Sequence, residues 1–133
     1  MKNPFDILFI DWDDTISIGS NSNLNPSAIE LIHLCLTLKI RVAIVTLNLW
    51  DPIEFPKSDQ VDVFRVGENS PPGEFSVIES KSDVINRIKK IEEKAIFIDD
   101  YMGERADVRK NVENIVVLDV PEIPWLIQKI KKK

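Results

Sequence analysis

Cysteine and histidine are almost absent from this sequence of 133 residues, which contains one of each, Cys35 and His33. A single cysteine excludes an intrachain disulfide and a zinc site built on cysteines alone. A Ser-His-Asp hydrolase, a zinc protease or a multi-histidine iron site would depend on the one histidine. The residue types that remain for catalysis are mainly carboxylates.

Long hydrophobic runs are also missing. No stretch approaches the roughly 20 apolar residues of a membrane span, and the run at residues 7–10 is short and bounded by Asp6 and Asp11. We therefore expect no membrane segment, no signal peptide and a cytoplasmic location. Hydrophobic residues make up 44% of the sequence, enough to build the core of one domain over residues 1–133. The formal charge of −5 argues against strong non-specific nucleic-acid binding.

Five short runs rich in isoleucine, valine and phenylalanine are spaced along the chain. Four are nearly continuous apolar segments, which are typical of strands buried on both faces of a parallel sheet. The third run alternates more and is expected near an edge of the sheet. The five predicted strands are residues 6–11, 41–46, 61–66, 95–99 and 115–119.

Helical patterns fall between these runs. Asn25 followed by Pro26 is typical of a helix start, and apolar residues recur at helical spacing after it. We expect Ser82 to cap a second helix that turns Ile91 toward the core. Two further helices are expected over residues 104–112 and from residue 121 to the C-terminus.

The alternation of strands and helices predicts an α/β domain with right-handed crossovers. The expected architecture is a Rossmann-like, three-layer domain with a central, mainly parallel five-stranded sheet. Residues 48–59 and residues 69–75, which include Pro71 and Gly73, are expected to be loops.

Polar residues follow three of the predicted strands. Because ligands of parallel sheets bind at the carboxyl ends of the strands, we expect these side chains to lie at one edge. Carboxylates brought together there repel one another unless a proton or a cation intervenes, and a few oxygen ligands with open positions favour Mg²⁺ over Ca²⁺. Each residue taken alone would more often be an ordinary loop or cap residue. The residues are Asp11, Asp13, Asp14, Thr46, Asn48, Asp99 and Asp100.

Four segments resemble the motifs of the haloacid dehalogenase superfamily of phosphohydrolases, in the family's order. LFIDWDDTI resembles the first motif, a strand followed by DxDxT, and VAIVT resembles the second, a strand ending in Thr or Ser. Lys81 corresponds to the lysine of the third motif, with Lys57 as the rival. IFIDDYMGE resembles the fourth motif, paired acids with a further acid downstream. The resemblance implies a Mg²⁺-dependent phosphatase that acts through an aspartyl-phosphate.

Catalytic roles follow from this resemblance residue by residue. Asp11 is expected to be the nucleophile and a metal ligand. Asp13 is expected to be the general acid and base, and its backbone carbonyl a metal ligand. Thr46, Asn48 and Lys81 are expected to bind phosphate oxygens. The alternatives are an ordinary strand-end residue for Thr46 and a solvated lysine at a helix start for Lys81.

The remaining metal ligands implied by the resemblance come from the fourth motif. Asp100 aligns best with the family's ligating acid, because Asp99 stands where glycine is common, and Glu104 matches the second acid. Asp99 is retained as a further candidate ligand. Asp107 could replace Glu104 or lie on an exposed helix face.

Two residues of the first motif keep open interpretations. Asp14 stands where many relatives have glycine, so its carboxylate lies either beside the metal or in solvent. Trp12 either packs in the core, which we favour, or stacks on a substrate base. Cys35 is expected to be a small buried residue and His33 a non-catalytic one.

Room for a cap domain is lacking in both places where larger relatives carry one. Residues 16–24 could form only a flap, and the segment between Thr46 and Lys81 holds one strand and two loops. We expect an open site that accepts phosphorylated substrates, macromolecular ones included, or that a second copy covers in a homo-oligomer. The alternatives are a catalytically silent binding module and a phosphotransferase on the same scaffold. A response-regulator domain fits less well, because Gly67 follows the third strand, where its phosphoacceptor would stand.

Overall fold

The chain folds around a five-stranded parallel sheet, and the computed structural model describes residues 3–19, 23–67 and 79–132. The strands lie in the order β5-β4-β1-β6-β7, and every pairing between them is parallel. All five predicted strands are confirmed to within one residue at each end, and β5 lies at an edge as predicted. Their bounds are β1 (Ile7–Ile10), β4 (Arg41–Thr46), β5 (Asp62–Arg65), β6 (Ala95–Ile98) and β7 (Ile115–Leu118).

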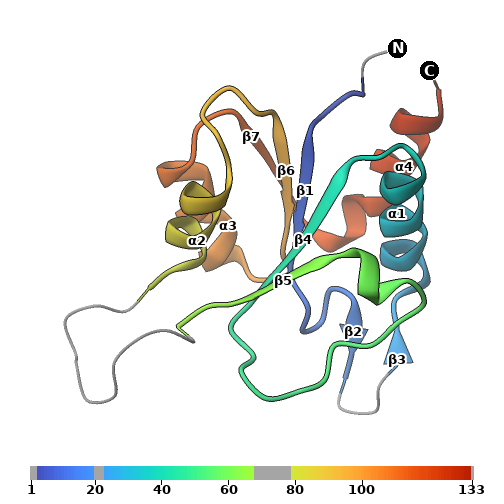
Figure 1. Cartoon of the computed structure of the whole chain (residues 1–133), viewed down its shortest axis with the longest axis horizontal. Helices are drawn as coiled ribbons and strands as arrows, with labels where there is room; N and C mark the ends of the chain where they lie inside the picture. Colours follow the sequence, from blue (N-terminus) through green and yellow to red (C-terminus); the bar gives the residue numbers. More distant parts are fainter. Residues whose placement is uncertain (1–2, 20–22, 68–78, 133) are drawn as a thin grey trace.

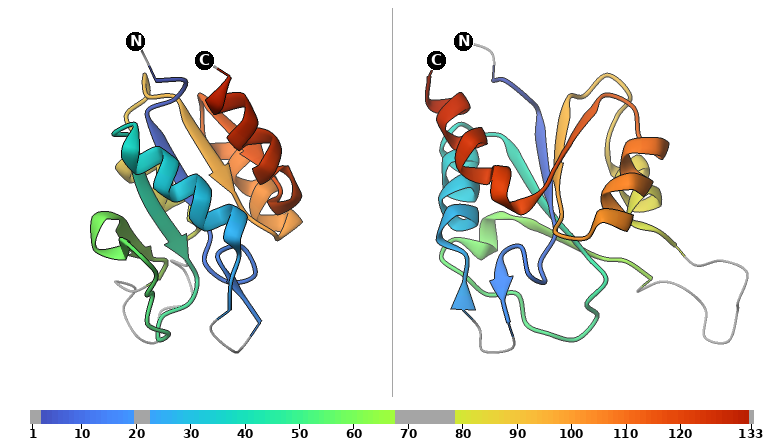
Figure 2. Two further views of the ribbon diagram at one scale, coloured as in Figure 1. Left: turned by 90° about the vertical axis from the view of Figure 1, so that its right-hand side faces the viewer. Right: turned by 180° about the vertical axis from the view of Figure 1, so that it is seen from behind.

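Helices cover both faces of the sheet, so that the domain has the three expected layers (Figure 1, Figure 2). Helices α1 (Pro26–Thr37) and α4 (Ile123–Lys131) lie on one face, and α2 (Lys81–Ile88) and α3 (Met102–Asn111) lie on the other. Successive side chains of a strand point to opposite faces. Leu8 and Ile10 of β1 accordingly pack with α1 and α4, whereas Ile7 and Phe9 pack with α2 and α3.

The start of α1 follows the predicted capping chemistry. The Asn25 side chain accepts a hydrogen bond from the Ser27 N–H, and Pro26 is the first helical residue. Proline is tolerated there because its missing N–H would have had no partner inside the helix.

The start of α2 differs from the prediction, which placed the cap at Ser82. Ser80 is the N-cap: its hydroxyl accepts from the Asp83 N–H, and the Asp83 carboxylate accepts from the Ser80 N–H. This reciprocal pair satisfies two donors that the helix itself cannot, and it makes Lys81 the first helical residue.

The prediction that Ile91 packs into the core is wrong. Helix α2 ends at Ile88, and Ile91 lies beyond it in the turn toward β6, with 77% of its surface exposed. Helix α3 begins at Met102 rather than near residue 104. Helix α4 begins at Ile123, because a short 3₁₀ turn, η2 (Val120–Glu122), precedes it and is capped by the Asp119 carboxylate.

The segments that connect the main strands and helices contain only short elements. Strands β2 (Ser17–Ile18) and β3 (Asn23–Leu24) form a small antiparallel hairpin in the segment expected to be a flap. Residues 48–59 are irregular as predicted, up to the short turn η1 (Ser58–Gln60). The loop predicted at residues 69–75 lies outside the described residues. The described part of the chain contains no cap domain, and none of its helices is long and apolar enough to cross a membrane.

Candidate active site

The candidate site lies where the three central strands end. Because the strands are parallel, their carboxyl ends share one edge of the sheet, the lower edge in Figure 1. Asp11 follows β1, Thr46 ends β4 and Asp99 follows β6, and all three side chains are buried. The backbone N–H of Asp11 donates to the Ile98 carbonyl at 2.9 Å, which continues the β1–β6 pairing to the site.

The Asp11 carboxylate is held by both of its oxygens. Oδ1 accepts from the Lys81 ammonium at 2.8 Å, and Oδ2 accepts from the Thr15 hydroxyl at 3.2 Å. Thr15 is fully buried in the turn after β1, where three backbone N–H groups, those of residues 15–17, converge on the Trp12 carbonyl. The turn therefore fixes the direction of the Asp11 side chain.

Lys81 joins two carboxylates from neighbouring strands. Its ammonium lies 2.8 Å from Asp11 and 2.6 Å from Asp99, and the residue is only 2% exposed. Burial alone would lower the pKa of Lys81, but Asp11 and Asp99 together raise it above its usual value. Lys81 is therefore a buried cation, whereas the rival Lys57 is exposed in the loop after β4.

Three carboxylates of the site, those of Asp11, Asp100 and Glu104, have raised pKa values. Burial raises the pKa of Asp11 to about 7, with the charge of Asp99 adding to the effect and that of Lys81 opposing it. Burial likewise raises the pKa values of Asp100 and Glu104, with a further contribution from Asp99. The single positive charge of Lys81 does not neutralise the negative charge that these carboxylates carry when ionised.

Three of the carboxylates have the geometry of a cation site. Single oxygens of Asp11, Asp99 and Asp100 all lie within 4.8 Å of one another. An all-oxygen donor set of this kind suits a hard ion such as Mg²⁺, which typically takes a few carboxylates and keeps open positions. Among the described residues, the predicted ligands Asp13 and Glu104 do not contribute carboxylate oxygens to this group.

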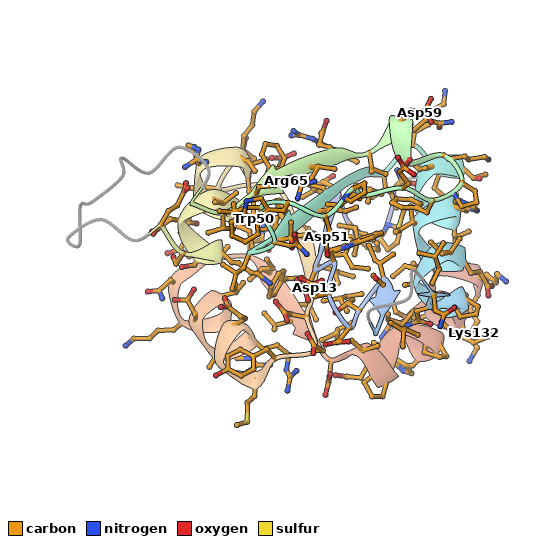
Figure 3. The ribbon with its side chains drawn as sticks, turned by 90° about the horizontal axis from the view of Figure 1, so that it is seen from below. Asp13, Trp50, Asp51, Asp59, Arg65 and Lys132 are labelled. Atoms are coloured by element: carbon orange, nitrogen blue, oxygen red, sulfur yellow. The ribbon has the colours of Figure 1, made fainter. Side chains whose placement is uncertain are left out.

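Asp13 and Asn48 follow the neighbouring strands β1 and β4 and contact each other. The Asn48 amide donates to Asp13 Oδ1 at 3.3 Å and to Asp51 Oδ2 at 2.8 Å. The Thr46 hydroxyl accepts from the Asn48 N–H at 3.0 Å. The structure thus brings Asn48 into contact with the predicted general acid, Asp13, which is itself exposed, and with the Thr46 hydroxyl. Figure 3 shows this edge of the sheet, on which Asp13, Asp51 and Trp50 are labelled.

Four other residues that the sequence interpretation considered lie outside the group of three carboxylates. Trp12 packs on Phe55 with ring centroids 6.2 Å apart, and Cys35 is fully buried, as predicted. Burial raises the pKa of the Cys35 thiol to about 12. Asp14 has a left-handed backbone with φ 59° and is exposed. His33 contacts the Pro56 carbonyl at the surface.

Asp107 is half-buried on α3. Its Oδ1 accepts from Asn111, and among the described residues its Oδ2 is the buried side-chain atom that lacks a hydrogen-bond partner. It does not belong to the group formed by Asp11, Asp99 and Asp100.

Three residues of the site have roles that the sequence interpretation did not assign. Thr15 orients Asp11, and the T of DxDxT was the available signal. Arg65 ties down the loop after β4 by donating to the Asn48 and Asp51 carbonyls at 2.8 and 2.7 Å. Arg105 donates to the Asp99 carbonyl at 3.0 Å. Arg65 acts on carbonyls 14 and 17 residues earlier in the chain, so no local pattern marks it. Arg105 acts on a carbonyl only six residues earlier, but nothing in the motif assigns it that contact.

Comparisons with protein-family models and with curated proteins found no match. A comparison with solved structures found two matches. The N-terminal part of the protein BF1531 from Bacteroides fragilis, described as containing a phosphatase domain complexed with Mg, aligns with a TM-score of 0.60 and 22% identity over 90% of this chain. This chain spans only 37% of that one. Rae1 (YacP) from Bacillus subtilis, in a W164L mutant, aligns at a TM-score of 0.49 and 15% identity over 96% of this chain and 77% of that one. The first likeness supports the parallel α/β fold.

Proposed function

We propose that this chain is a Mg²⁺-dependent phosphomonoester hydrolase of the haloacid dehalogenase type, with Asp11 as its nucleophile. The observation that carries the proposal is the buried Lys81 bridge between Asp11 and Asp99, with Asp100 alongside. A buried cation beside a buried, oriented carboxylate is a suitable receptor for a phosphoryl group. The description of the BF1531 domain as a phosphatase domain with Mg agrees with it.

The donor set formed by Asp11, Asp99 and Asp100 fits Mg²⁺. When bound, the ion would offset the repulsion between the anionic nucleophile and the anionic phosphate. The backbone carbonyl of Asp13 is the further ligand that the family resemblance implies. The Glu104 carboxylate lies outside the group of three and would act on the ion from farther away than these ligands.

The chain's own groups account for the remaining chemistry. A carboxylate oxygen of Asp11 attacks phosphorus while the bond to the leaving oxygen breaks, and Asp13 donates a proton to that oxygen. Water then attacks the aspartyl-phosphate, Asp13 takes its proton, and inorganic phosphate leaves as Asp11 is restored. Lys81 and the Thr46 hydroxyl hold phosphoryl oxygens during both steps.

The test is hydrolysis of p-nitrophenyl phosphate and of a panel of natural phosphomonoesters in the presence of Mg²⁺. We expect turnover that EDTA abolishes and that Asp11→Asn lowers by at least about a thousandfold. Asp59→Asn changes an exposed aspartate in the short turn η1, and this matched control should leave the rate unchanged. Folded, Mg²⁺-supplied protein that turns over none of the panel would refute the proposal.

A further inference from the structure

The most exposed large apolar side chain of the described residues stands at the edge of the candidate site. Trp50 is 84% exposed and follows β4, the strand beside β1. Figure 3 shows Trp50 near Asp51 and on the same edge of the sheet as Asp13. On the other side of β1, after β6, Tyr101 is also exposed. Two exposed aromatic residues therefore flank the strand that carries the nucleophile.

The loop that carries Trp50 is firmly built. Asn48 Oδ1 accepts from the backbone N–H groups of Trp50 and Asp51 at 3.0 and 2.9 Å. Arg65 clamps the same turn through the Asn48 and Asp51 carbonyls. These four hydrogen bonds tie down the backbone of the turn that presents the exposed indole to solvent.

The loop also connects Trp50 to the catalytic group. The Asn48 side chain contacts Asp13 Oδ1 through its amide nitrogen and the Trp50 N–H through its amide oxygen. One asparagine side chain therefore separates the proposed general acid from the backbone of Trp50. Asp11 is buried whereas the Trp50 indole is 84% exposed, so a ring stacked on the indole would lie at the surface, with a spacer between it and a phosphate at Asp11.

We propose that Trp50 stacks on the nucleobase of a nucleoside monophosphate whose phosphate is hydrolysed at Asp11; this rests on the proposed phosphatase function. A sugar supplies the spacer between phosphate and base, whereas the ring of a phosphotyrosine is bonded directly to the phosphate oxygen. Stacking on an aromatic side chain is a general way to bind a base. Asp13 and Asp51 at the same edge would repel additional phosphates, which favours a monophosphate.

The kinetic test compares adenosine 5′-monophosphate with ribose 5-phosphate, which have the same phosphoester but differ in the base. Trp50→Ala should lower the ratio of kcat/KM for the nucleotide to that for the sugar phosphate by about tenfold, a typical size for loss of a base stack. Trp50→Phe should retain most of the ratio. Trp125→Ala removes the half-exposed tryptophan of α4 and should leave the ratio unchanged. An unchanged ratio in Trp50→Ala would overturn the proposal.

A binding test separates this proposal from the phosphatase proposal. Adenosine 5′-monophosphate is titrated into Asp11→Asn protein with Mg²⁺, with and without Trp50→Ala, and followed by calorimetry. About tenfold weaker binding in the double variant supports stacking even if no phosphate is turned over, in which case the phosphatase proposal alone fails. Equal affinity of the two proteins, or a preference for O-phosphotyrosine that depends on Trp50, would overturn the nucleotide assignment.

Discussion

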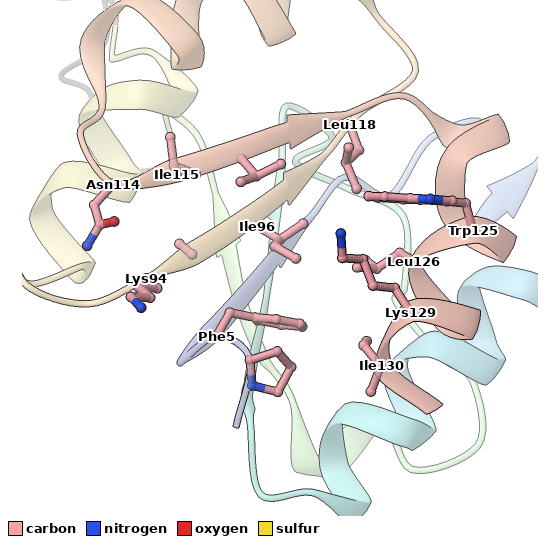
Figure 4. Close-up of a pocket in the computed structure, with 13 residues that line it drawn as sticks. Phe5, Lys94, Ile96, Asn114, Ile115, Leu118, Trp125, Leu126, Lys129 and Ile130 are labelled. Carbon is pink, nitrogen blue, oxygen red and sulfur yellow. The ribbon is translucent and has the colours of Figure 1, made fainter. Parts of the chain in front are cut away.

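Two hollows of this molecule differ in size and in chemistry. The larger one, about 540 Å³, is a groove beside α4 lined mainly by apolar side chains of β6, β7 and α4, with Phe5 at one end and Trp125 near the other (Figure 4). We call it the α4 groove. The smaller hollow, about 290 Å³, lies beside Asp13 and includes Asp51 and Glu54 in its lining. The candidate active site borders the smaller hollow.

The difference has a physical explanation. β7 is an edge strand and α4 covers its face only in part, so that Val116 and Trp125 remain about half exposed and the groove needs no special arrangement of residues. Each buried charge, in contrast, costs several kcal/mol unless it is paired. The buried Lys81 between Asp11 and Asp99 is therefore stable only because each of these charges has a partner at close range. Buried charge, rather than the volume of a hollow, locates the chemistry of this fold.

The largest expected effect is that of Lys81→Met. The substitution leaves Asp11 and Asp99 buried without their cation, so the free energy of unfolding should fall by about 3 kcal/mol or more. Phosphatase activity should be lost with it. Urea denaturation measures the first effect, and Lys57→Met, at the exposed rival lysine, should change neither quantity. Wild-type stability in Lys81→Met would show that the bridge does not form.

Metal binding should have the next largest effect. Mg²⁺ at a hundredfold excess over its dissociation constant should stabilise the protein by about 2.7 kcal/mol, seen as a rise in Tm. Asp100→Asn should lose most of this gain, because it removes one of three clustered carboxylates. Asp59→Asn is expected to keep the gain. A rise in Tm for Asp100→Asn equal to that of the wild type would show that the metal binds elsewhere.

A smaller effect is expected at the cap of α2, the helix that carries Lys81. Ser80→Ala removes the hydroxyl that accepts from the Asp83 N–H and should lower stability by about 1 kcal/mol. The denaturation midpoint reports it. Lys81 directly follows the cap. If the activity of Ser80→Ala falls by more than the loss of folded protein accounts for, the cap also positions the lysine.

The pH dependence of the same cap is weaker still. The Ser80 N–H lowers the pKa of Asp83 below its usual value. A carboxylate with a lowered folded pKa contributes stability above its unfolded pKa, and the contribution is lost as the pH falls through the folded pKa. The stability difference between wild type and Asp83→Asn should therefore be largest near neutral pH and shrink below about pH 4. A difference that is constant with pH would contradict this.

The α4 groove supplies the smallest effect. Trp125 lies in it with the Lys129 ammonium 5.0 Å from its ring centroid, an exposed cation–π contact worth about 0.5–1 kcal/mol. Lys129→Met removes the cation but keeps the apolar stem, so it should lower the free energy of unfolding by about this amount and leave kcat/KM on all phosphates unaltered. Loss of turnover in Lys129→Met would show that the α4 groove, and not only the smaller hollow, contributes to the chemistry.

The sequence predicted the strands well because their signal is local. A strand buried on both faces is a continuous apolar run, and β1, β4, β6 and β7 each have one. Helix boundaries were less accurate. Ser80 and Ser82 are both plausible caps by composition, and only the reciprocal bonds with Asp83 distinguish them. Ile91 fits the apolar repeat of α2, but the helix ends before it.

By itself, the sequence determined the order of strands and helices and the acids that end the central strands, since both depend on neighbouring residues. Only the tertiary structure decided which of these groups meet. Lys81 lies 70 residues after Asp11 in the chain, yet the crossover through α2 brings its ammonium to 2.8 Å from that carboxylate. The clamp of Arg65 on the Trp50 loop likewise depends on β5 lying beside β4. Such contacts arise from packing of distant segments, which no local pattern encodes.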